Sequence, residues 1–173
     1  MSTFAHAVRA EIAGDTELVE QLATDAFRIG TDGNEPDAAA YFGTHLVEVN
    51  FMRGTMGELR PIIEQFVVDY PGMPGFAATL ALAHVEADCA DEARTLLVDF
   101  ASRDFDLPLD PLWLSAMADY AEAAVECRAP EYAAPLLERM TPWADQLCTS
   151  GGGSAEGPMS HFLGGLAALL GRY

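Results

Sequence analysis

Apolar side chains recur along this chain at the spacing of amphipathic helices. The clearest run lies within residues 57–70, where apolar residues follow three and four positions apart: Leu59, Ile62, Ile63, Phe66, Val67 and Tyr70. This spacing places them on one face of a helix. Thr55 and Glu58 predict a capping box at its start, and Pro71 with Gly72 predicts its end. The same stripe recurs in three further segments: 19–27, 93–101 and 133–140.

A second kind of predicted helix, rich in small residues, lies between these segments. It occurs over residues 38–51, 75–88, 112–127 and 160–171. Small side chains let helices approach closely, and glycines such as Gly164 and Gly165 inside a helix indicate a packing reason. Alternation of the two kinds is typical of an array of helix hairpins. The equivalent positions Leu59 and Ala93 are 34 residues apart, which is the tetratricopeptide period.

These patterns predict an all-α fold in a single domain over residues 1–173. We expect a right-handed superhelix of antiparallel helix hairpins, a tetratricopeptide-like α-solenoid with about seven to eight helices. The expected hairpins cover residues 4–30, 37–71, 74–104 and 111–148, followed by an unpaired helix over 158–172. The segment SGGGSAEG (150–157) is predicted to be a flexible linker, because it has neither the lysine nor the preceding strand of a phosphate-binding loop.

The charge of the chain narrows the classes of partner. Acidic residues outnumber basic ones 27 to 9, every basic residue is Arg, and the formal net charge is −18. Such a surface disfavours direct contact with nucleic acid or anionic membranes. Three cysteines without a CxxC spacing indicate buried thiols and not a disulfide framework. No uncharged apolar run reaches the ~18 residues of a membrane span, so we expect a soluble, cytoplasmic protein.

Three stretches carry a resemblance to a known family: GTDGNEPDAAAYFG (30–43), ADEARTLL (90–97) and LAALLGRY (166–173). With these, nearly the whole chain resembles the degenerate tetratricopeptide-like helical region of large actinobacterial regulators, the LuxR-type and adenylate-cyclase-type ATP-binding proteins. The resemblance implies a sensor or docking arm beside an NTPase. The chain has no GxxxxGK[ST] motif and no lysine, so an ATP site does not carry over.

In tetratricopeptide arrays the inner faces of the first helices of each hairpin line a concave groove. Carried over to this chain, those positions give a groove with apolar patches and a line of carboxylates: Tyr41, Thr44, Glu48, Phe51, Met52, Leu82, Glu86, Glu122 and Glu126. Such a groove would favour a peptide or helix with basic and hydrophobic residues. The alternative is that the glutamates form an ordinary solvent-exposed face.

The last predicted helix lacks a hairpin partner and is almost wholly apolar. Terminal helices of repeat arrays need a polar outer face, so we expect this helix to mediate self-association, as in a homodimer, or to continue into a longer solenoid. The alternative is that this helix is a terminal cap that makes no contact with another chain. The residues expected to form the contact are Phe162, Leu163, Leu166 and Leu170.

No catalytic, cofactor or metal site is expected. His84 and Asp88 have a metal-compatible spacing beside Cys89, but no second cluster supplies further ligands, so an interhelix hydrogen bond is favoured. The same applies to His45 with Glu48 and to His161. The sequence therefore favours a non-enzymatic protein–protein interaction or regulatory docking module of a bacterial transcriptional or signalling regulator. The alternative is a small-ligand-sensing helical domain of such a regulator, and an enzyme is least favoured.

Overall fold

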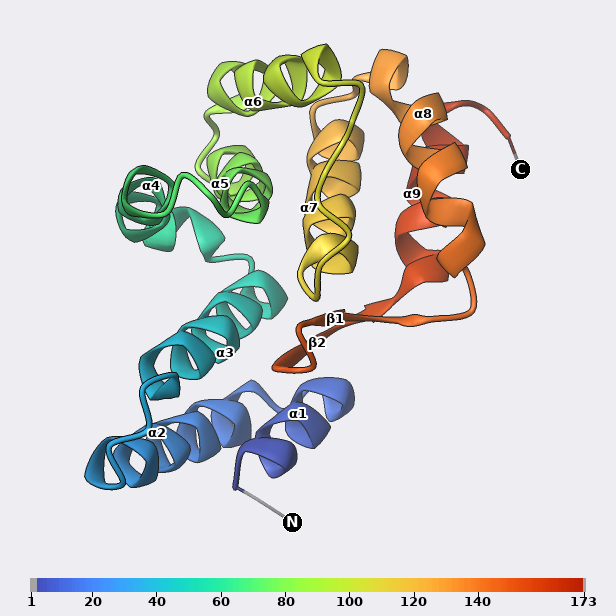
Figure 1. Ribbon diagram of the computed structural model, residues 1–173. Coiled ribbons are helices and arrows are strands. Elements are labelled where there is room, and N and C mark those ends of the chain that lie inside the picture. Colours follow the sequence, from blue (N-terminus) through green and yellow to red (C-terminus); the bar gives the residue numbers. More distant parts are fainter. Residues whose placement is uncertain (1–2, 173) are drawn as a thin grey trace.

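The computed structural model describes residues 3–172 and is mostly helical, which confirms the expected class. Residues 3–172 form nine α-helices, against about seven to eight expected, and their arrangement can be followed in Figure 1. They are α1 (Thr3–Ala13), α2 (Thr16–Asp32), α3 (Ala38–Arg53), α4 (Arg60–Asp69), α5 (Gly75–Glu86), α6 (Ala90–Ser102), α7 (Trp113–Glu126), α8 (Pro130–Met140) and α9 (Met159–Leu169). Two 3₁₀ helices, η1 (Met56–Leu59) and η2 (Thr141–Trp143), precede α4 and follow α8. No described helix is both long and apolar enough to cross a membrane.

The helices follow an arc, which Figure 1 shows from α1 and α2 through α3 to α6 and on to α8 and α9. Helix α2 packs on α1 and α3, α5 packs on α4, α6 and α7, and α9 packs on α7 and α8. Local chemistry sets the turns between them. Asp15 caps α2 by accepting a hydrogen bond from the Leu18 N–H at 3.1 Å. Gly54 ends α3 in the left-handed conformation, which glycine adopts without strain.

The largest core lies between α5, α6, α7, α8 and α9. Its centre is a stacked aromatic pair, Phe100 and Tyr120, whose ring centroids are 4.0 Å apart. Two smaller clusters lie elsewhere, one around Met56 and Ile63 and the other around Val19 and Val49. The arc is therefore built on separate cores, which leaves room on its inner side.

The segment predicted to be a flexible linker is ordered, and this expectation is wrong. It forms an antiparallel hairpin of β1 (Leu147–Ser150) and β2 (Ser154–Pro158), in which Ser150 pairs with Ser154. Gly151 and Gly152 supply the turn with φ of +59° and +73°, conformations that other residues adopt only with strain. The hairpin contacts α1, α3 and α7, and these contacts, absent from the local sequence pattern, order it.

Helix α9 is not the unpaired helix that the sequence predicts. It packs on α7 and α8, and Phe162 and Leu166 are buried within the chain with 3% and 0% of their surfaces exposed. Leu163 and Leu170 are half-buried beside the same core. The apolar residues of α9 are thus largely buried against the rest of the chain. They are buried because the hairpin turns the chain back so that α9 reaches α7.

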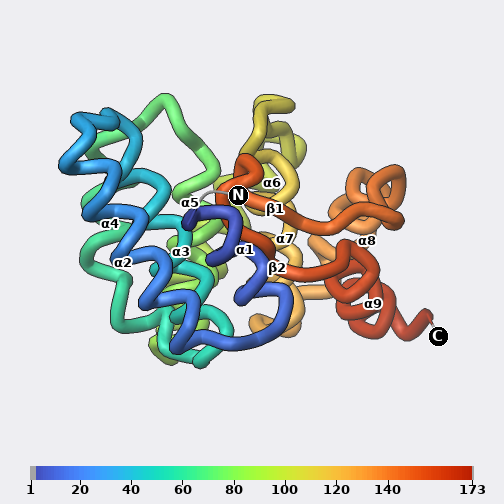
Figure 2. Tube along the Cα trace, turned by 90° about the horizontal axis from the view of Figure 1, so that it is seen from below, coloured from blue at the N-terminus to red at the C-terminus, as the bar shows by residue number. Residues whose placement is uncertain are grey.

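The hairpin also joins the two ends of the arc. The Ala155 N–H donates a hydrogen bond of 2.9 Å to Glu11 Oε2, across 144 residues of chain. Figure 2 shows β2 lying beside α1, with α8 and α9 at one side of the molecule. This contact places the hairpin along one side of the space described next.

Candidate functional site

A cavity of about 740 Å³ lies on the inner side of the arc. Helices α3, α4, α5 and α7 form its walls, together with the hairpin, the loop before α7 and Phe162 of α9. Small-molecule sites in proteins measure roughly 300–1,000 Å³ and form where several elements meet. The cavity therefore has the size and the construction of a binding site for a small organic molecule.

One wall of the cavity is aromatic. Phe66 of α4, Tyr70 after it and Phe76 of α5 form a triangle with ring centroids 5.7 to 6.1 Å apart. Tyr41 and Phe51 of α3 line the same cavity. The amphipathic pattern of residues 57–70 explains the first two positions, because one face of α4 turns inward. This wall offers flat apolar surfaces to a ligand.

Another part of the lining is acidic. Glu48 of α3, Asp119 and Glu122 of α7 and Glu156 of β2 all line the cavity, and none of its described lining residues is Arg, Lys or His. Glu48 is only 3% exposed and accepts no hydrogen bond from any residue that the structure describes. Asp119 and Glu156 keep some accessible surface because they face the cavity. The carboxyl groups thus meet in the protein interior without a basic side chain.

This environment raises the pKa of each carboxyl group. Burial, with the charges of Glu11 and Asp119, raises the pKa of Glu48 to about 8. Burial likewise raises the pKa of Asp119 to about 7, against a hydrogen bond of 2.8 Å from Thr79 Oγ1. Burial and the charges of Asp119 and Glu48 hold the pKa of Glu156 well above its ordinary value. Such shifts arise where like charges and desolvation disfavour ionisation, and they are common at functional sites.

A hydrogen-bonded group behind Glu48 fixes the hairpin and α3. Glu11 of α1 lies 2.6 Å from His45 Nδ1 through one oxygen, and its other oxygen accepts the Ala155 N–H. Both side chains are buried, at 4% and 1% exposure. His45 therefore makes an interhelix hydrogen bond, as expected, but with Glu11 and not within α3. Both oxygens of Glu11 have partners, so this residue serves the fold.

Six of the nine predicted groove residues line the cavity: Tyr41, Thr44, Glu48, Phe51, Leu82 and Glu122. The other three lie elsewhere. Met52 packs against the cluster around Val19 and Val49, and Glu126 is exposed. Glu86 Oε2 accepts the Met56 N–H at 2.6 Å.

The start of the helical segment after α3 is capped differently from the sequence expectation. Glu86 of α5 satisfies the Met56 N–H at the beginning of η1. Thr55 makes no side-chain cap there, and its hydroxyl donates instead to Asn50 Oδ1 at 2.8 Å. The predicted capping box of Thr55 and Glu58 is therefore wrong, because the Glu58 N–H donates to the Thr55 carbonyl at 3.0 Å and the Thr55 hydroxyl is engaged with Asn50. Glu86 is consequently engaged in the fold and not in the cavity.

Sequence reasoning missed Asp119, Glu156 and Glu11. Asp119 lies on the same face of α7 as Glu122, three positions earlier, and a polar residue in an alanine-rich helix was a usable signal. Glu156 gave no such signal, because it belongs to the segment that the sequence predicts as a linker. Glu11 meets this region only through a contact between distant parts of the chain.

The residues considered for metal binding do not come together as a site. His84 is buried, and burial lowers its pKa. Cys89 accepts a hydrogen bond from Arg60 at 3.1 Å and donates to the Ala87 carbonyl. Within residues 3–172, no group of three His, Cys, Asp or Glu side chains is arranged to hold a metal ion.

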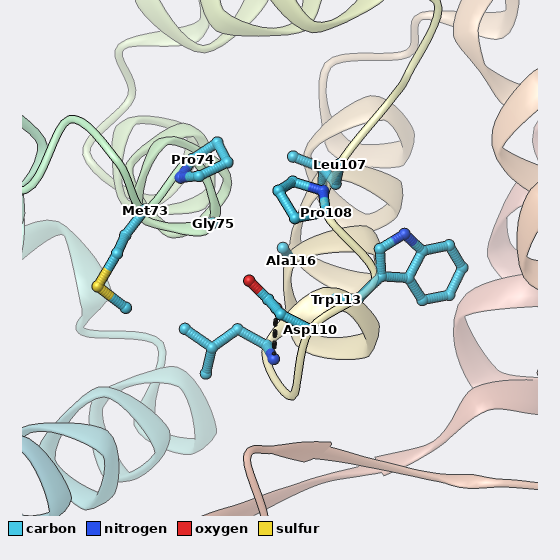
Figure 3. Close-up of a pocket in the computed structure, with 9 residues that line it drawn as sticks. Met73, Pro74, Gly75, Leu107, Pro108, Asp110, Trp113 and Ala116 are labelled. Carbon is cyan, nitrogen blue, oxygen red and sulfur yellow. Dashed lines mark hydrogen bonds between the residues drawn. The ribbon is translucent and has the colours of Figure 1, made fainter.

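A small crevice adjoins the cavity where the turn before α5 meets the loop before α7. Figure 3 shows Pro74 on one side of this crevice, opposite Leu107 and Pro108. The Leu112 N–H donates to Asp110 Oδ1 at 2.8 Å and holds the loop. The crevice has a volume of about 10 Å³, which is space for about one water molecule. It is too small for an organic ligand, so the larger cavity is the candidate site.

No protein-family model matches this chain, and comparisons with curated proteins and with solved structures also find no match. The function therefore has to be inferred from the cavity and its lining.

Proposed function

We propose that this chain is a non-enzymatic helical domain that binds a small organic molecule in the cavity between α3, α4, α5, α7 and the hairpin. The observation that carries the proposal is the cavity itself, about 740 Å³ in volume, with an aromatic wall and buried carboxyl groups. Protein interiors are otherwise close-packed, and the lining of this hollow includes the exposed aromatic side chains Tyr41, Phe66 and Tyr70. A bound ligand would remove this apolar surface from water.

A sensing role fits the resemblance of the sequence to the helical arms of bacterial regulators. The cavity walls come from elements far apart in the chain, from α3 to the hairpin. A ligand that touches all of them would bind the closed arc better than an opened one, and differential binding of this kind shifts a conformational equilibrium. The proposal includes a superhelical arrangement of the hairpins, as in the resembling arrays, with the cavity on its concave side.

The test uses a neutral fluorescent probe, N-phenylnaphthylamine, and a variant that fills the cavity. Gly43 lines the cavity on α3, and a Cβ atom added there meets no atom within 4 Å. We expect Gly43→Leu to place its side chain in the cavity and weaken probe binding at least about tenfold. Gly164→Leu is the matched control, because Gly164 also has open space around it but does not line the cavity.

The proposal predicts saturable probe binding by the parent and by Gly164→Leu, with unchanged circular dichroism in both variants. Absence of saturable binding by the parent would contradict it. Equal binding by the parent and by folded Gly43→Leu would place the probe elsewhere and would also count against the proposal.

A second candidate is the docking of a basic, hydrophobic peptide, and the exposed face of α4 favours it. Ile62 and Val68 are exposed apolar residues of α4 that do not line the cavity, in a chain of net charge −18. Exposed apolar groups in one region are typical of interaction surfaces. Ile62→Glu with Val68→Glu should abolish capture of a basic amphipathic peptide and leave probe binding in the cavity intact. Unchanged peptide binding in this variant would remove α4 from consideration.

A further inference from the structure

No basic side chain among the described lining residues neutralises the carboxyl groups of the cavity. Five carboxyl groups line the space, Asp37 just before α3 and four others from α3, α7 and β2, and none of its described lining residues is basic. Thr79 donates one hydrogen bond to Asp119, and Cys148 Sγ donates one of 3.2 Å to Glu156 Oε2. These neutral donors do not supply positive charge. Ionising a buried carboxyl group that has no basic partner costs free energy. These residues therefore lower the stability of the ligand-free protein when they are charged.

Glu48 is the clearest sign of an absent partner. It lines the cavity, and only 3% of its surface is exposed. It accepts no hydrogen bond from the described residues. The neighbouring Glu11 shows that the same region can satisfy a buried carboxylate fully, through His45 and the Ala155 N–H. Buried polar groups in proteins are normally hydrogen-bonded. Glu48 therefore has the geometry of a group that meets its partner in the cavity.

On the basis of the proposed ligand-binding function, we infer that the ligand is a hydrophobic organic cation. Its ammonium group lies among Glu48, Asp119 and Glu156, and its apolar body lies against the aromatic wall of α3, α4 and α5. A cation at this position supplies the charge that the lining lacks. Tyr41 and Phe51 of α3 also line the cavity, and aromatic rings attract cations.

The apolar part of the ligand has a defined place. Phe66, Tyr70 and Phe76 lie together on the side formed by α4 and α5. The acids come from α3, α7 and β2. A ligand with a charged end and an aromatic or aliphatic end matches this division. A small hydrated ion would leave the aromatic wall uncovered, and a neutral apolar molecule would leave the carboxyl groups unpaired.

Protons and the cation compete for the same carboxyl groups. Without ligand, burial and mutual repulsion keep protons on Glu48 and Asp119 near neutral pH, with pKa values raised to about 8 and about 7. A cation favours their ionised forms, so its binding releases protons and strengthens as pH rises. The other titratable groups that face this cluster are Glu11 of α1, Glu122 of α7, Cys148 of β1 and, beside Glu122, His161 of α9.

The experiment compares two ligands of equal shape on the full chain. Biphenylbutyl-trimethylammonium carries a permanent positive charge, and its neutral analogue carries a tert-butyl group in place of trimethylammonium. Both displace N-phenylnaphthylamine from the cavity. At pH 8.5 we expect the cation to bind at least about tenfold more tightly than the neutral analogue. At pH 5.5 this preference should fall by at least about threefold, because the carboxyl groups then hold their protons.

Variants assign the preference to the acids. Glu48→Gln and Glu156→Gln keep the size of the side chain and remove its charge, so each should reduce the ratio of cation affinity to neutral-analogue affinity at pH 8.5 by at least about threefold. Glu126→Gln is the matched control, because Glu126 lies on α7 but is exposed and does not line the cavity. The preference of the Glu126→Gln variant for the cation over the neutral analogue should stay within about twofold of that of the parent.

The outcomes separate this inference from the proposed function. Equal binding of both ligands at pH 8.5 overturns the cationic ligand and leaves the small-molecule function standing. An undiminished preference in both glutamine variants also overturns it. Failure of the probe and of both ligands to bind overturns the proposed function, and the inference with it.

Discussion

Glu11 and Glu48 are buried glutamates in the same region, but their carboxyl groups are satisfied in different ways. Glu11 has a partner for each oxygen, His45 for one and the Ala155 N–H for the other. Glu48 has no hydrogen-bond partner among the described residues and faces the cavity. The first arrangement supports the fold, because it joins α1, α3 and β2. The second costs the fold free energy when Glu48 is ionised, and the proposed cationic ligand would offset this cost.

Replacement of Glu11 should therefore destabilise the protein. Glu11→Ala leaves the Ala155 N–H and His45 Nδ1 buried without partners, and we expect a loss of about 3 kcal/mol in the free energy of unfolding. Urea denaturation measures this change. Glu17→Ala, at an exposed position of α2, should change it by less than about 0.5 kcal/mol. Equal effects of the two substitutions would contradict the structural role of Glu11.

Glu48 should make the stability of the ligand-free protein depend on pH. Its pKa is about 8 in the folded protein against 4.5 as the ordinary value, so the folded state holds the proton more tightly. The resulting stabilisation is complete below pH 4.5 and is lost as pH rises through 8. The slope for one such group is at most about 1.4 kcal/mol per pH unit.

Glu48→Gln should remove this contribution. Denaturation in urea at several values between pH 5 and pH 8 should give a shallower decline for the variant than for the parent, since a glutamine does not titrate. Asp119 and Glu156 contribute with the same sign, so a residual decline is expected. Identical slopes in the two proteins would show that Glu48 does not titrate in this range.

At the scale of elements, the hairpin shows how tertiary contacts select one of two structures. Its glycines suit a flexible linker as well as a tight turn, and the local sequence does not separate these outcomes. Contacts with α1, α3 and α7 stabilise the turn. As a result, Glu156 lies in the cavity and α9 packs on α7 and α8. An element that the sequence predicts as a spacer thus positions part of the site.

Two glycine substitutions test the ordered turn. An added Cβ meets no atom within 4 Å at either Gly152 or Gly164, but Gly152 has a φ of +73° and Gly164 is helical. Gly152→Ala should lower stability by about 1–2 kcal/mol through backbone strain. Gly164→Ala should raise it by about 0.5–1 kcal/mol. Thermal unfolding compares them, and a stabilising Gly152→Ala would indicate a disordered turn.

At the scale of the whole molecule, three separate core clusters are held in one arc by contacts between its ends. The largest cluster spans α5 to α9, whereas α1 to α3 form a cluster of their own. The hairpin bridges them through β2 and α1. This arrangement leaves the cavity on the inner side of the arc, because helices that packed on one continuous core would leave no space of this size.

Self-association through α9 stays a prediction, and the structure changes how it should be tested. Leu166 is fully buried, so Leu166→Glu should unfold the protein and does not report on an interface. Leu170 is half-buried at the end of α9, so Leu170→Glu is better suited. Light scattering across concentration should show a dimeric parent and a folded monomeric Leu170→Glu variant. A parent that is monomeric at every concentration would contradict self-association.

Local pattern by itself determined most of the helices. Helix formation depends on residues three and four positions apart, so the stripe around Ile63 and Phe66 was sufficient to predict α4, and Pro71 with Gly72 to predict its end. The positions carried over from tetratricopeptide arrays, and not this local pattern, placed Glu48 and Glu122 on inward faces, and both line the cavity. The same carry-over was wrong for Met52, Glu86 and Glu126, because a predicted helix face does not say which neighbour it packs against.

Only the tertiary structure decided the hairpin, the place of α9 and the pairing of Glu11 with Ala155. The last contact spans 144 residues, and nothing in the spacing of nearby residues encodes it. The same holds for the carboxyl cluster, in which Glu48 and Glu156 meet only because the hairpin turns back into the arc. Sequence periodicity specifies the helices that a chain forms, whereas the burial of charge depends on which distant segments pack together.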